Sequence, residues 1–203
     1  NDKLYGKLSY DKGDDGVNHL FGEKGEDLLI GAGNTDYIYG GEDNDLITGF
    51  AGDDWLYGEE GDDRIYGDEG QSSWGNPYVI TGVDHIYGGA GNDYLDGGNG
   101  DDWVYGDEGD DIVLGYFGDD HIFGGDGNDD VAGGAGNDFV YGDDGDDVLR
   151  GDWPVASLDA DPNAGGADHL FGGRGDDQID GGYGDDELHG DEGNDILYAN
   201  AGE

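Results

Sequence analysis

The sequence predicts an all-β solenoid in which short parallel strands stack into two sheets. The chain has 203 residues, of which 47 are glycine, and most of it divides into eighteen units of nine residues. The sixth residue of the unit is Asp in every unit except the first, and the eighth is always Leu, Ile or Val. A fixed period of this kind is the signature of a repeat architecture. A disordered acidic chain has no reason to keep such a register.

Each unit supplies one turn and one strand. The units begin at residues 13, 22, 31, 40, 49, 58, 79, 88, 97, 106, 115, 124, 133, 142, 163, 172, 181 and 190, and unit 88–96 reads Gly-Gly-Ala-Gly-Asn-Asp-Tyr-Leu-Asp. Glycine at positions one, two and four permits positive φ in a tight turn. Positions seven to nine form a strand whose eighth side chain points inward. Two units therefore make one coil, and units n and n+2 stack on the same side.

The charge of the chain excludes several classes of function. Asp and Glu number 52 against 7 Lys and Arg, which gives a formal net charge of -45. Nucleic acids and anionic membranes are polyanions and would repel this chain. No apolar run approaches the ~20 residues that a membrane-spanning helix needs. There is no cysteine, so a disulfide framework is excluded.

The repeated pattern Gly-Gly-x-Gly-x-Asp-x-apolar-x resembles that of the RTX, or hemolysin-type, calcium-binding repeat proteins. The resemblance implies that residues 1–203 form a single right-handed parallel β-roll. It also implies that several Ca²⁺ ions, the cofactor of the family, lie between stacked turns and are held by loop carbonyls and position-six carboxylates. Those carboxylates are Asp27, Asp36, Asp45, Asp54, Asp63, Asp84, Asp93, Asp102, Asp111, Asp120, Asp129, Asp138, Asp147, Asp168, Asp177, Asp186 and Asp195.

A few units depart from the pattern, and we expect the calcium sites that touch their turns to be weak or empty. Asn18 replaces the sixth-position Asp of the first unit. Asn34 and Asp43 replace the fourth-position Gly, and Val79 and Asn163 replace the first.

Calcium is expected to be required for folding. Pairing each unit with the unit two along gives about 16 sites, whose ions would carry about 32 positive charges. Without metal, like-charged carboxylates would stack about 4.8 Å apart, the spacing of neighbouring strands. The core is only one apolar residue per strand, so the metal-free chain should be expanded. Turn sites of this kind suit millimolar calcium, which predicts an extracellular or cell-surface location.

One face of the predicted roll is aromatic. In the odd-numbered units, outward positions seven and nine carry only aromatic residues or His over eight consecutive coils, whereas the even-numbered units follow no such rule. These residues are His19, Phe21, Tyr37, Tyr39, Trp55, Tyr57, His85, Tyr87, Trp103, Tyr105, His121, Phe123, Phe139, Tyr141, His169 and Phe171. General strand preference would act on both sheets. We therefore expect a binding face for a second copy or another domain, with a polysaccharide as the alternative partner.

The histidines of this face are interpreted as part of the aromatic surface and not as metal ligands. His85 and His121 lie two coils apart, or about 9.6 Å. That separation is too large for one ion with bonds of about 2 Å.

Insertions interrupt the period near residues 7–13, 68–78 and 152–162, and the register survives each of them. We expect loops that leave a continuous coil, which either tolerate variation or contact a partner. Residues 1–5 correspond to positions five to nine of a unit, and residues 199–203 to positions one to five. Such half-units would suit either a piece of a longer array or end-to-end stacking of subunits.

Catalysis is not expected, because acid pairs such as Asp53–Asp54 recur in nearly every turn and none stands out. The chain contains no nucleophile elbow, P-loop or zinc-protease motif. Two functional classes remain open. One is a calcium-stiffened structural protein that assembles into a surface layer or filament. The other is a secretion, folding or polysaccharide-binding module of a larger exported enzyme, toxin or adhesin.

Overall fold

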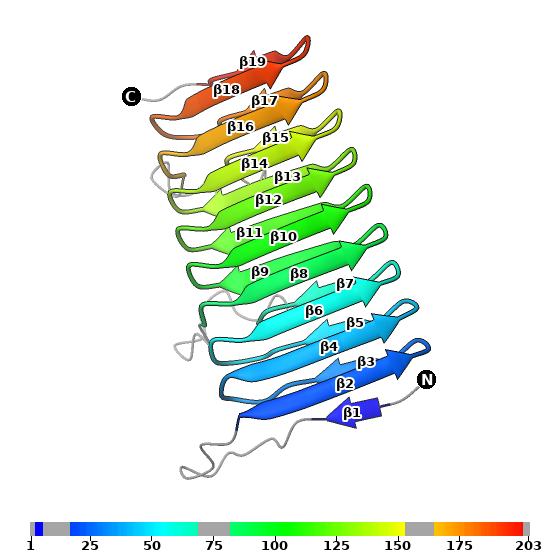
Figure 1. Cartoon of the computed structure of the whole chain (residues 1–203). Helices are drawn as coiled ribbons and strands as arrows, with labels where there is room; N and C mark the ends of the chain where they lie inside the picture. Colours follow the sequence, from blue (N-terminus) through cyan, green and yellow to red (C-terminus); the bar gives the residue numbers. More distant parts are fainter. Residues whose placement is uncertain (1–2, 6–16, 69–81, 153–164, 201–203) are drawn as a thin grey trace.

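The computed structural model describes residues 3–5, 17–68, 82–152 and 165–200, and it shows a parallel β-solenoid (Figure 1). The described residues form nineteen strands in two sheets. Sheet A has ten strands in the order β1 (Lys3–Tyr5), β3 (Leu28–Ile30), β5 (Leu46–Thr48), β7 (Arg64–Tyr66), β9 (Tyr94–Asn99), β11 (Ile112–Phe117), β13 (Asp130–Ala135), β15 (Val148–Arg150), β17 (Gln178–Asp180) and β19 (Ile196–Tyr198). Sheet B has nine strands in the order β2 (Asn18–Lys24), β4 (Asp36–Glu42), β6 (Trp55–Glu60), β8 (His85–Ala90), β10 (Trp103–Glu108), β12 (His121–Asp126), β14 (Phe139–Asp144), β16 (His169–Arg174) and β18 (Glu187–Glu192).

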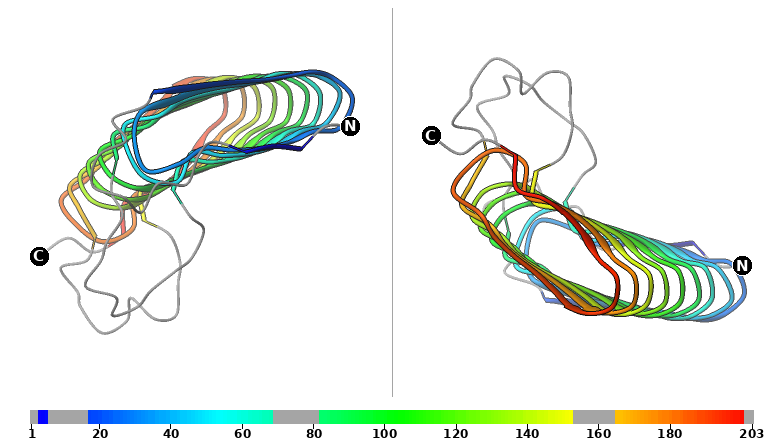
Figure 2. Two further views of the ribbon diagram at one scale, coloured as in Figure 1. Left: turned by 90° about the horizontal axis from the view of Figure 1, so that it is seen from below. Right: turned by 90° about the horizontal axis from the view of Figure 1, so that it is seen from above.

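The predicted coil is confirmed. Every strand pair is parallel and joins units two apart in the sequence, for example Val104↔Ile122. Across an insertion the register continues, with Leu56↔Ile86 thirty residues apart. The first half-unit also holds its predicted place, because β1 pairs with β3 through Leu4↔Leu29. Viewed along the solenoid axis, successive coils overlay as flattened loops whose long sides are the two sheets (Figure 2).

The core is a column of position-eight side chains between the sheets. Fifteen aliphatic residues from Leu29 to Ile179 are fully buried there, and Leu20 and Leu188 pack against them. Because each coil contributes only two such residues, the hydrophobic core is thin for a chain of this charge. Burial of a Leu, Ile or Val contributes about 1.5–3 kcal/mol. The turns must therefore be stabilised by something other than apolar packing.

The strands of sheet B are longer than the sequence suggested. The prediction confined each strand to positions seven to nine, but these strands run for six or seven residues into positions one to three of the next unit. The extension occurs because turn residues of neighbouring coils also pair, as in Asp107↔Gly125 and Glu108↔Asp126. Three strands of sheet A, β9, β11 and β13, are extended in the same way.

Candidate metal centres

The position-six aspartates form two continuous ladders along the solenoid, one on each side of the core. From Asp27 to Asp177, the backbone N–H of each aspartate donates a hydrogen bond to Oδ1 of the aspartate one coil further on. Asp102 donates to Asp120 and Asp120 donates to Asp138, with distances of 2.8 and 2.9 Å. The ladder crosses an insertion without change, since Asp63 donates to Asp93 at 2.6 Å. One oxygen of each carboxylate thus holds the backbone of the preceding turn.

The other carboxylate oxygen, Oδ2, is buried and accepts no hydrogen bond in most of these residues. They are Asp45, Asp54, Asp63, Asp84, Asp93, Asp102, Asp111, Asp120, Asp129, Asp138, Asp147, Asp168, Asp177 and Asp186. Asp36 differs, because its Oδ2 accepts a hydrogen bond of 2.6 Å from the backbone N–H of Ala32. A buried polar atom without a partner costs about 1–3 kcal/mol, and more when it is charged. A cation bound along the column would lower this cost.

The unpartnered oxygens lie beside backbone carbonyls of the next coil. A Cβ atom added to Gly58 would lie 2.3 Å from Oδ2 of Asp63 and 2.4 Å from the carbonyl oxygen of Gly88. The first position of the unit is therefore glycine because oxygen atoms from two coils approach its α-carbon. Carboxylate and carbonyl oxygens are the ligands that Ca²⁺ takes, so the residues present fit calcium.

Burial makes these carboxyl groups weak acids in the metal-free fold. Desolvation raises the pKa of Asp84 and Asp120 to about 9, and that of Asp54 and Asp168 to about 8. The charge of neighbouring aspartates adds to the effect of burial, as Asp102 does for Asp84. Such shifts occur where a charge is buried without a counter-charge. A divalent cation in the turn would supply one.

No side chain of the described residues supplies that counter-charge. Ion pairs of Lys24, Arg150 and Arg174 go to the outer carboxylates of Glu42, Asp130 and Asp144, not to the ladders. Within the described ranges, no group of three or more His, Cys, Asp or Glu side chains gathers as a metal site. Such a cluster is not expected if each ion is held by one or two carboxylates and several carbonyl oxygens, as the resemblance implies.

The structure places the predicted aspartates in equivalent positions. Those from Asp27 to Asp177 are buried, and Asp186 and Asp195, in the last coils, are half-buried. The position-six replacement Asn18 also belongs to the series, because its backbone N–H and its side-chain Nδ2 both donate to Oδ1 of Asp36.

The expectation that two units lack the first glycine was wrong. Val79 and Asn163 lie outside the described residues, and Gly67 and Gly151 occupy the first position. A Cβ on either would lie 2.3 Å from Oδ2 of Asp84 or Asp168, the contact that Gly58 makes with Asp63. Each insertion therefore enters within a turn, after its second residue. The nine-residue period alone could not locate the insertion point. The register of the later units is the same wherever in the turn the extra residues are placed.

Sequence reasoning missed a second set of ladders at position five. Here the backbone N–H of the later coil donates to Oδ1 of the earlier coil, the opposite direction to the position-six ladders. Asp110 donates to Asn92 at 3.0 Å, and Asn128 donates to Asp110 at 2.9 Å. In the position-five ladder beside sheet A, several Asp and Asn residues alternate from coil to coil. Because Asn is neutral, this stretch of the ladder carries about half the negative charge of an all-Asp column. The signal was available, because Asp or Asn fills position five in most units.

The outward aromatic residues of sheet B form two columns of stacked rings, which we call the aromatic ladder. In the position-nine column, from Phe21 to His189, centroids lie 4.8–5.0 Å apart and planes differ by 2–8°. In the position-seven column His85 stacks between Trp55 and Trp103, with centroids 4.1 and 6.4 Å away. Burial between these rings lowers the pKa of His85. The histidines thus belong to the ring stack, as predicted.

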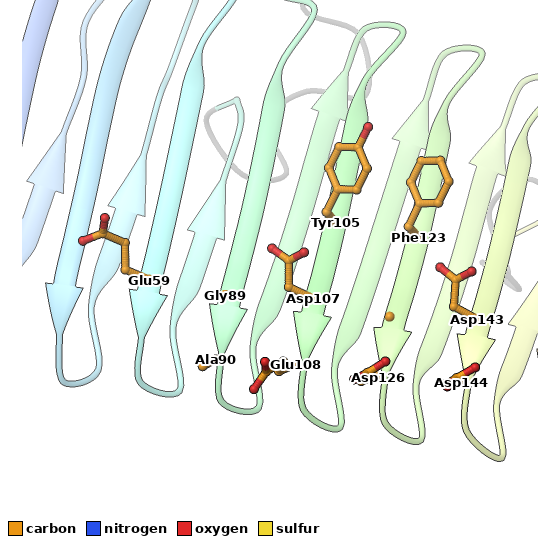
Figure 3. A pocket seen from close by; sticks show the side chains of 11 residues that line it. Glu59, Gly89, Ala90, Tyr105, Asp107, Glu108, Phe123, Asp126, Asp143 and Asp144 are labelled. Atoms are coloured by element: carbon orange, nitrogen blue, oxygen red, sulfur yellow. The ribbon is translucent and has the colours of Figure 1, made fainter.

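A groove lined with acids runs beside the aromatic ladder. Tyr105 and Phe123 line one wall, and Glu59, Asp107 and Asp143 lie along the other (Figure 3). The position-two carboxylates alternate with glycines from coil to coil because a Cβ on Gly125 would lie 2.2 Å from the carbonyl oxygen of Asp107. The face of sheet B therefore combines stacked rings with a row of negative charge.

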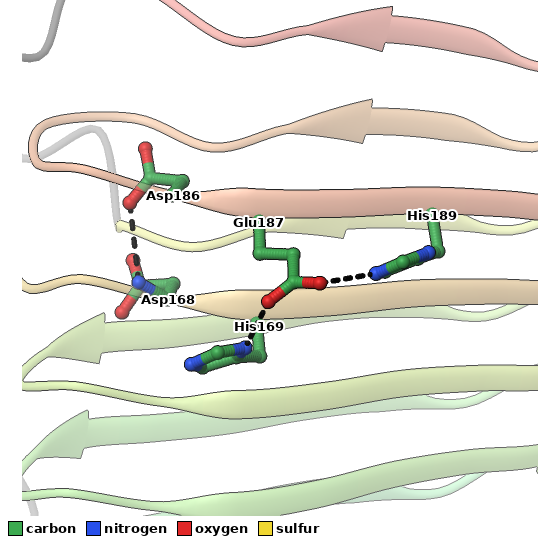
Figure 4. Close-up of polar contacts among 5 residues, drawn as sticks. All are labelled: Asp168, His169, Asp186, Glu187 and His189. Atoms are coloured by element: carbon green, nitrogen blue, oxygen red, sulfur yellow. Dashed lines mark hydrogen bonds and ion pairs between the residues drawn. The ribbon is translucent and has the colours of Figure 1, made fainter.

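The position-seven column ends at Glu187, where the aromatic pattern of the sequence also ends. Its carboxylate bridges His169 of the preceding coil, at 3.2 Å from Nδ1, and His189 of its own strand, at 2.9 Å from Nε2 (Figure 4). The hydrogen bond with His189 lowers the pKa of Glu187. Beside this bridge, the N–H of Asp168 donates to Asp186 in the regular ladder (Figure 4).

Comparison with known proteins agrees with this geometry. Within the described ranges no helix is long and apolar enough to cross a membrane. Comparison with curated proteins yields no match. A family model described as RTX calcium-binding nonapeptide repeat (4 copies) matches residues 12–47, 42–72, 80–113, 105–140, 123–153 and 164–197. These segments cover most of the chain and coincide with the coils whose turns carry the aspartate ladders. The chain therefore belongs to the family of RTX calcium-binding nonapeptide repeat proteins.

Proposed function

We propose that this chain is an extracellular structural solenoid that calcium folds and stiffens. The observation that carries the proposal is the column of buried Oδ2 atoms without hydrogen-bond partners, from Asp45 to Asp186. Each lies beside carbonyl oxygens of the adjacent coil, and no described cation neutralises it. When bound, calcium would supply positive charge and join the oxygens of neighbouring turns. The protein's part is to hold the oxygens in place through the Oδ1 hydrogen bonds.

The location follows from the same chemistry. Sites that rest on one or two carboxylates and on carbonyl oxygens are expected to bind calcium weakly, in the range of extracellular modules. Millimolar calcium outside the cell would fill them, whereas cytosolic calcium would leave the carboxylates charged and repelling. Members of the family are typically found in exported proteins, which supports an extracellular or cell-surface location.

The aromatic ladder is the proposed contact surface for a second copy or for another domain. Its side chains are mostly half-buried by one another, and their edges form the outer surface of sheet B. Because ring faces stack on ring faces, the flat surfaces that a sugar ring would cover are already occupied within the columns. This arrangement favours a protein partner over a polysaccharide.

The second candidate is a module of a larger exported enzyme, toxin or adhesin, in which calcium folds the solenoid after export. The same ladders support it, because folding that waits for extracellular calcium suits transport of an unfolded chain. The difference between the candidates lies in what the aromatic ladder contacts.

Sedimentation velocity tests both steps. We expect a slowly sedimenting, expanded chain in chelator and a compact one in millimolar calcium, and an unchanged profile would reject the calcium fold. Large species in calcium would support the structural role, and Trp55→Ala with Trp103→Ala should then reduce them. Tyr183→Ala is the matched control, because Tyr183 is exposed and lies outside the ladder. Compact monomers in calcium would favour the module.

A further inference from the structure

Two aspartates mark the points where the twelve-residue insertions leave the coil. Asp68 and Asp152 occupy position two of their units, directly after Gly67 and Gly151. Elsewhere the acids at position two, such as Asp107 and Asp143, have φ of 75° and 74° and are exposed. Asp68 and Asp152 do not have positive φ, and they are only 4 % and 8 % exposed. The change of backbone conformation turns their carboxylates over the next coil.

The carboxylate of Asp68 is fixed in this position with one oxygen left over. Its Oδ2 accepts a hydrogen bond of 3.1 Å from the backbone N–H of Asn99. A Cβ on Gly98 would lie 2.8 Å from Cβ of Asp68, so glycine at 98 leaves room for the aspartate. Its Oδ1 is buried and has no hydrogen-bond partner. An ionised oxygen held there without a partner is costly, and a cation beside it would lower that cost.

A second buried carboxylate lies on the neighbouring strand. Asp96 of β9 is 7 % exposed, and its carbonyl oxygen accepts a hydrogen bond of 2.8 Å from the N–H of Gly67, the residue before Asp68. The carboxyl groups of Asp96 and Asp68 lie close enough for their charges to interact. Among the described residues no donor reaches the Asp96 carboxylate. The inserted sequence 69–81 contains no Lys, Arg or His to neutralise it.

We propose that Asp68 and Asp96 bind an additional calcium ion, at a site beside the regular turns. Its two side-chain ligands come from positions two and nine of the unit, instead of position six. Two carboxylates balance the charge of one divalent cation, and hard oxygen ligands suit calcium. The site lies where the insertion leaves the coil. A bound ion would therefore link Asp68, the last residue before the insertion, to the next coil.

The chain contains a near-copy of this arrangement in which the second carboxylate has hydrogen-bond donors. Asp152 and Asp180 lie 84 residues after Asp68 and Asp96. Oδ2 of Asp152 accepts a hydrogen bond from the N–H of Tyr183. Asp180 accepts from the N–H of Gly182 at 3.2 Å and from Nδ2 of Asn200 at 2.5 Å.

A cation also lies next to the copy. Arg150 is the strand partner of Asp180, whereas uncharged Tyr66 is the strand partner of Asp96. Asp180 therefore has two hydrogen-bond donors and a neighbouring positive charge, whereas among the described residues Asp96 has neither. One additional ion, at Asp68 and Asp96, is the consequence.

Anomalous scattering from crystals of the full chain grown in calcium tests the site. We expect a peak within bonding distance of Oδ1 of Asp68, besides the peaks in the regular turns. Peaks in the turns with none at Asp68 would overturn this site and leave the proposed function intact. An absence of peaks throughout would overturn both.

Counting bound calcium in solution gives an independent measurement. Asp68→Asn and Asp96→Asn should each bind one ion fewer per chain than the unsubstituted protein, and Asp152→Asn should bind the same number. An unchanged count in Asp68→Asn would mean that the two carboxyls share a proton in place of a cation, which overturns the proposal. Circular dichroism in saturating calcium shows that each variant is folded before its ions are counted.

Discussion

The backbone N–H of Asp54 donates a 2.8 Å hydrogen bond to Oδ1 of Asp84, a residue thirty positions further along the chain. Units without an insertion make the same bond across eighteen residues, as between Asp36 and Asp54 at 2.7 Å. A turn is thus held by the carboxylate of the next coil, whatever the length of chain between them. One oxygen of the aspartate has a structural role in the fold, and the second is the proposed calcium ligand.

The different roles of the two carboxylate oxygens predict the effect of Asp120→Asn. The amide oxygen can still accept from the N–H of Asp102, but the charge that faces the ion is lost. We expect the calcium concentration at the folding midpoint to rise, with a loss of about 1.5–3 kcal/mol, the range for a hydrogen bond to a charged group. Calcium titrations followed by far-UV circular dichroism would measure it.

Asp119→Asn is the matched control, since Asp119 is exposed and its Oδ1 accepts from the N–H of Asn137 at 2.9 Å in the position-five ladder. An amide oxygen can make that bond equally well, so the calcium midpoint should not move. Equal shifts in the two variants would contradict the assignment of the ion to position six.

Acid should partly replace calcium in folding the chain. The unfolded carboxyl group has a pKa of about 3.9, whereas burial raises the folded-state pKa of Asp54 and Asp168 to about 8 and of Asp84 and Asp120 to about 9. A raised carboxyl pKa favours the metal-free fold below the unfolded value and opposes it as pH rises through the folded value. Lowering the pH of metal-free protein from about 8 to about 5 should therefore increase its sheet content.

Circular dichroism of dialysed, metal-free protein across this range is the measurement. In saturating calcium the sheet signal should stay constant, because the ions already neutralise the carboxylates. Calcium added near neutral pH should also release protons into unbuffered solution. A metal-free sheet signal that grows as pH rises would show that the ladders are not the groups that limit folding.

The sequence predicted the solenoid almost completely because its two strongest constraints are periodic. A buried aliphatic at position eight and an aspartate at position six recur in register, and together they define the strand, the turn and the pairing two units on. Two local features could not be predicted from the sequence. The insertion point after Asp68 leaves the period unchanged, and the burial of Asp68 depends on a backbone torsion that no spacing encodes.

The aromatic ladder also combines a feature that the sequence predicts with one that it does not. Its membership followed from counting positions seven and nine, but the fact that Tyr87, Tyr105 and Phe123 present edges and not faces follows from ring packing. With strands about 4.8 Å apart, flat rings in register can only stack. This geometry changes which partners suit the surface.

Glycine at position one should be irreplaceable. A Cβ on Gly106 would lie 2.2 Å from the carbonyl oxygen of Gly124 and 2.4 Å from Oδ2 of Asp111. Gly106→Ala must therefore displace oxygens proposed to hold calcium, and it should weaken calcium-dependent folding by about 1–3 kcal/mol, the cost of an overpacked site. Gly33→Ala is the control, because nothing lies within 4 Å of its added Cβ. If both variants were equally stable in denaturation experiments carried out in the presence of calcium, the proposed crowding of oxygen atoms around the first-position glycine would be refuted.

The aromatic ladder should contribute to stability through its rings and not through its hydroxyl groups. Tyr105 stacks on Tyr87 and on Phe123 with centroids 4.8 Å away in both cases and planes that differ by 2° and 3°. Tyr105→Ala removes two stacked pairs, each of which contributes about 0.5–1.5 kcal/mol beyond area burial. Tyr105→Phe should keep both, because Phe already occupies this column at positions 123 and 171.

Thermal unfolding in saturating calcium would compare the two variants, with the alanine variant lower in midpoint and the phenylalanine variant unchanged. A similar loss in both would mean that the phenol groups, and so a polar contact along the column edge, stabilise the face. The comparison also separates stability from assembly. If Tyr105→Phe keeps the midpoint but abolishes large species in sedimentation, the ring edges and their hydroxyls are the contact with the partner, and the stacking serves to hold them in line.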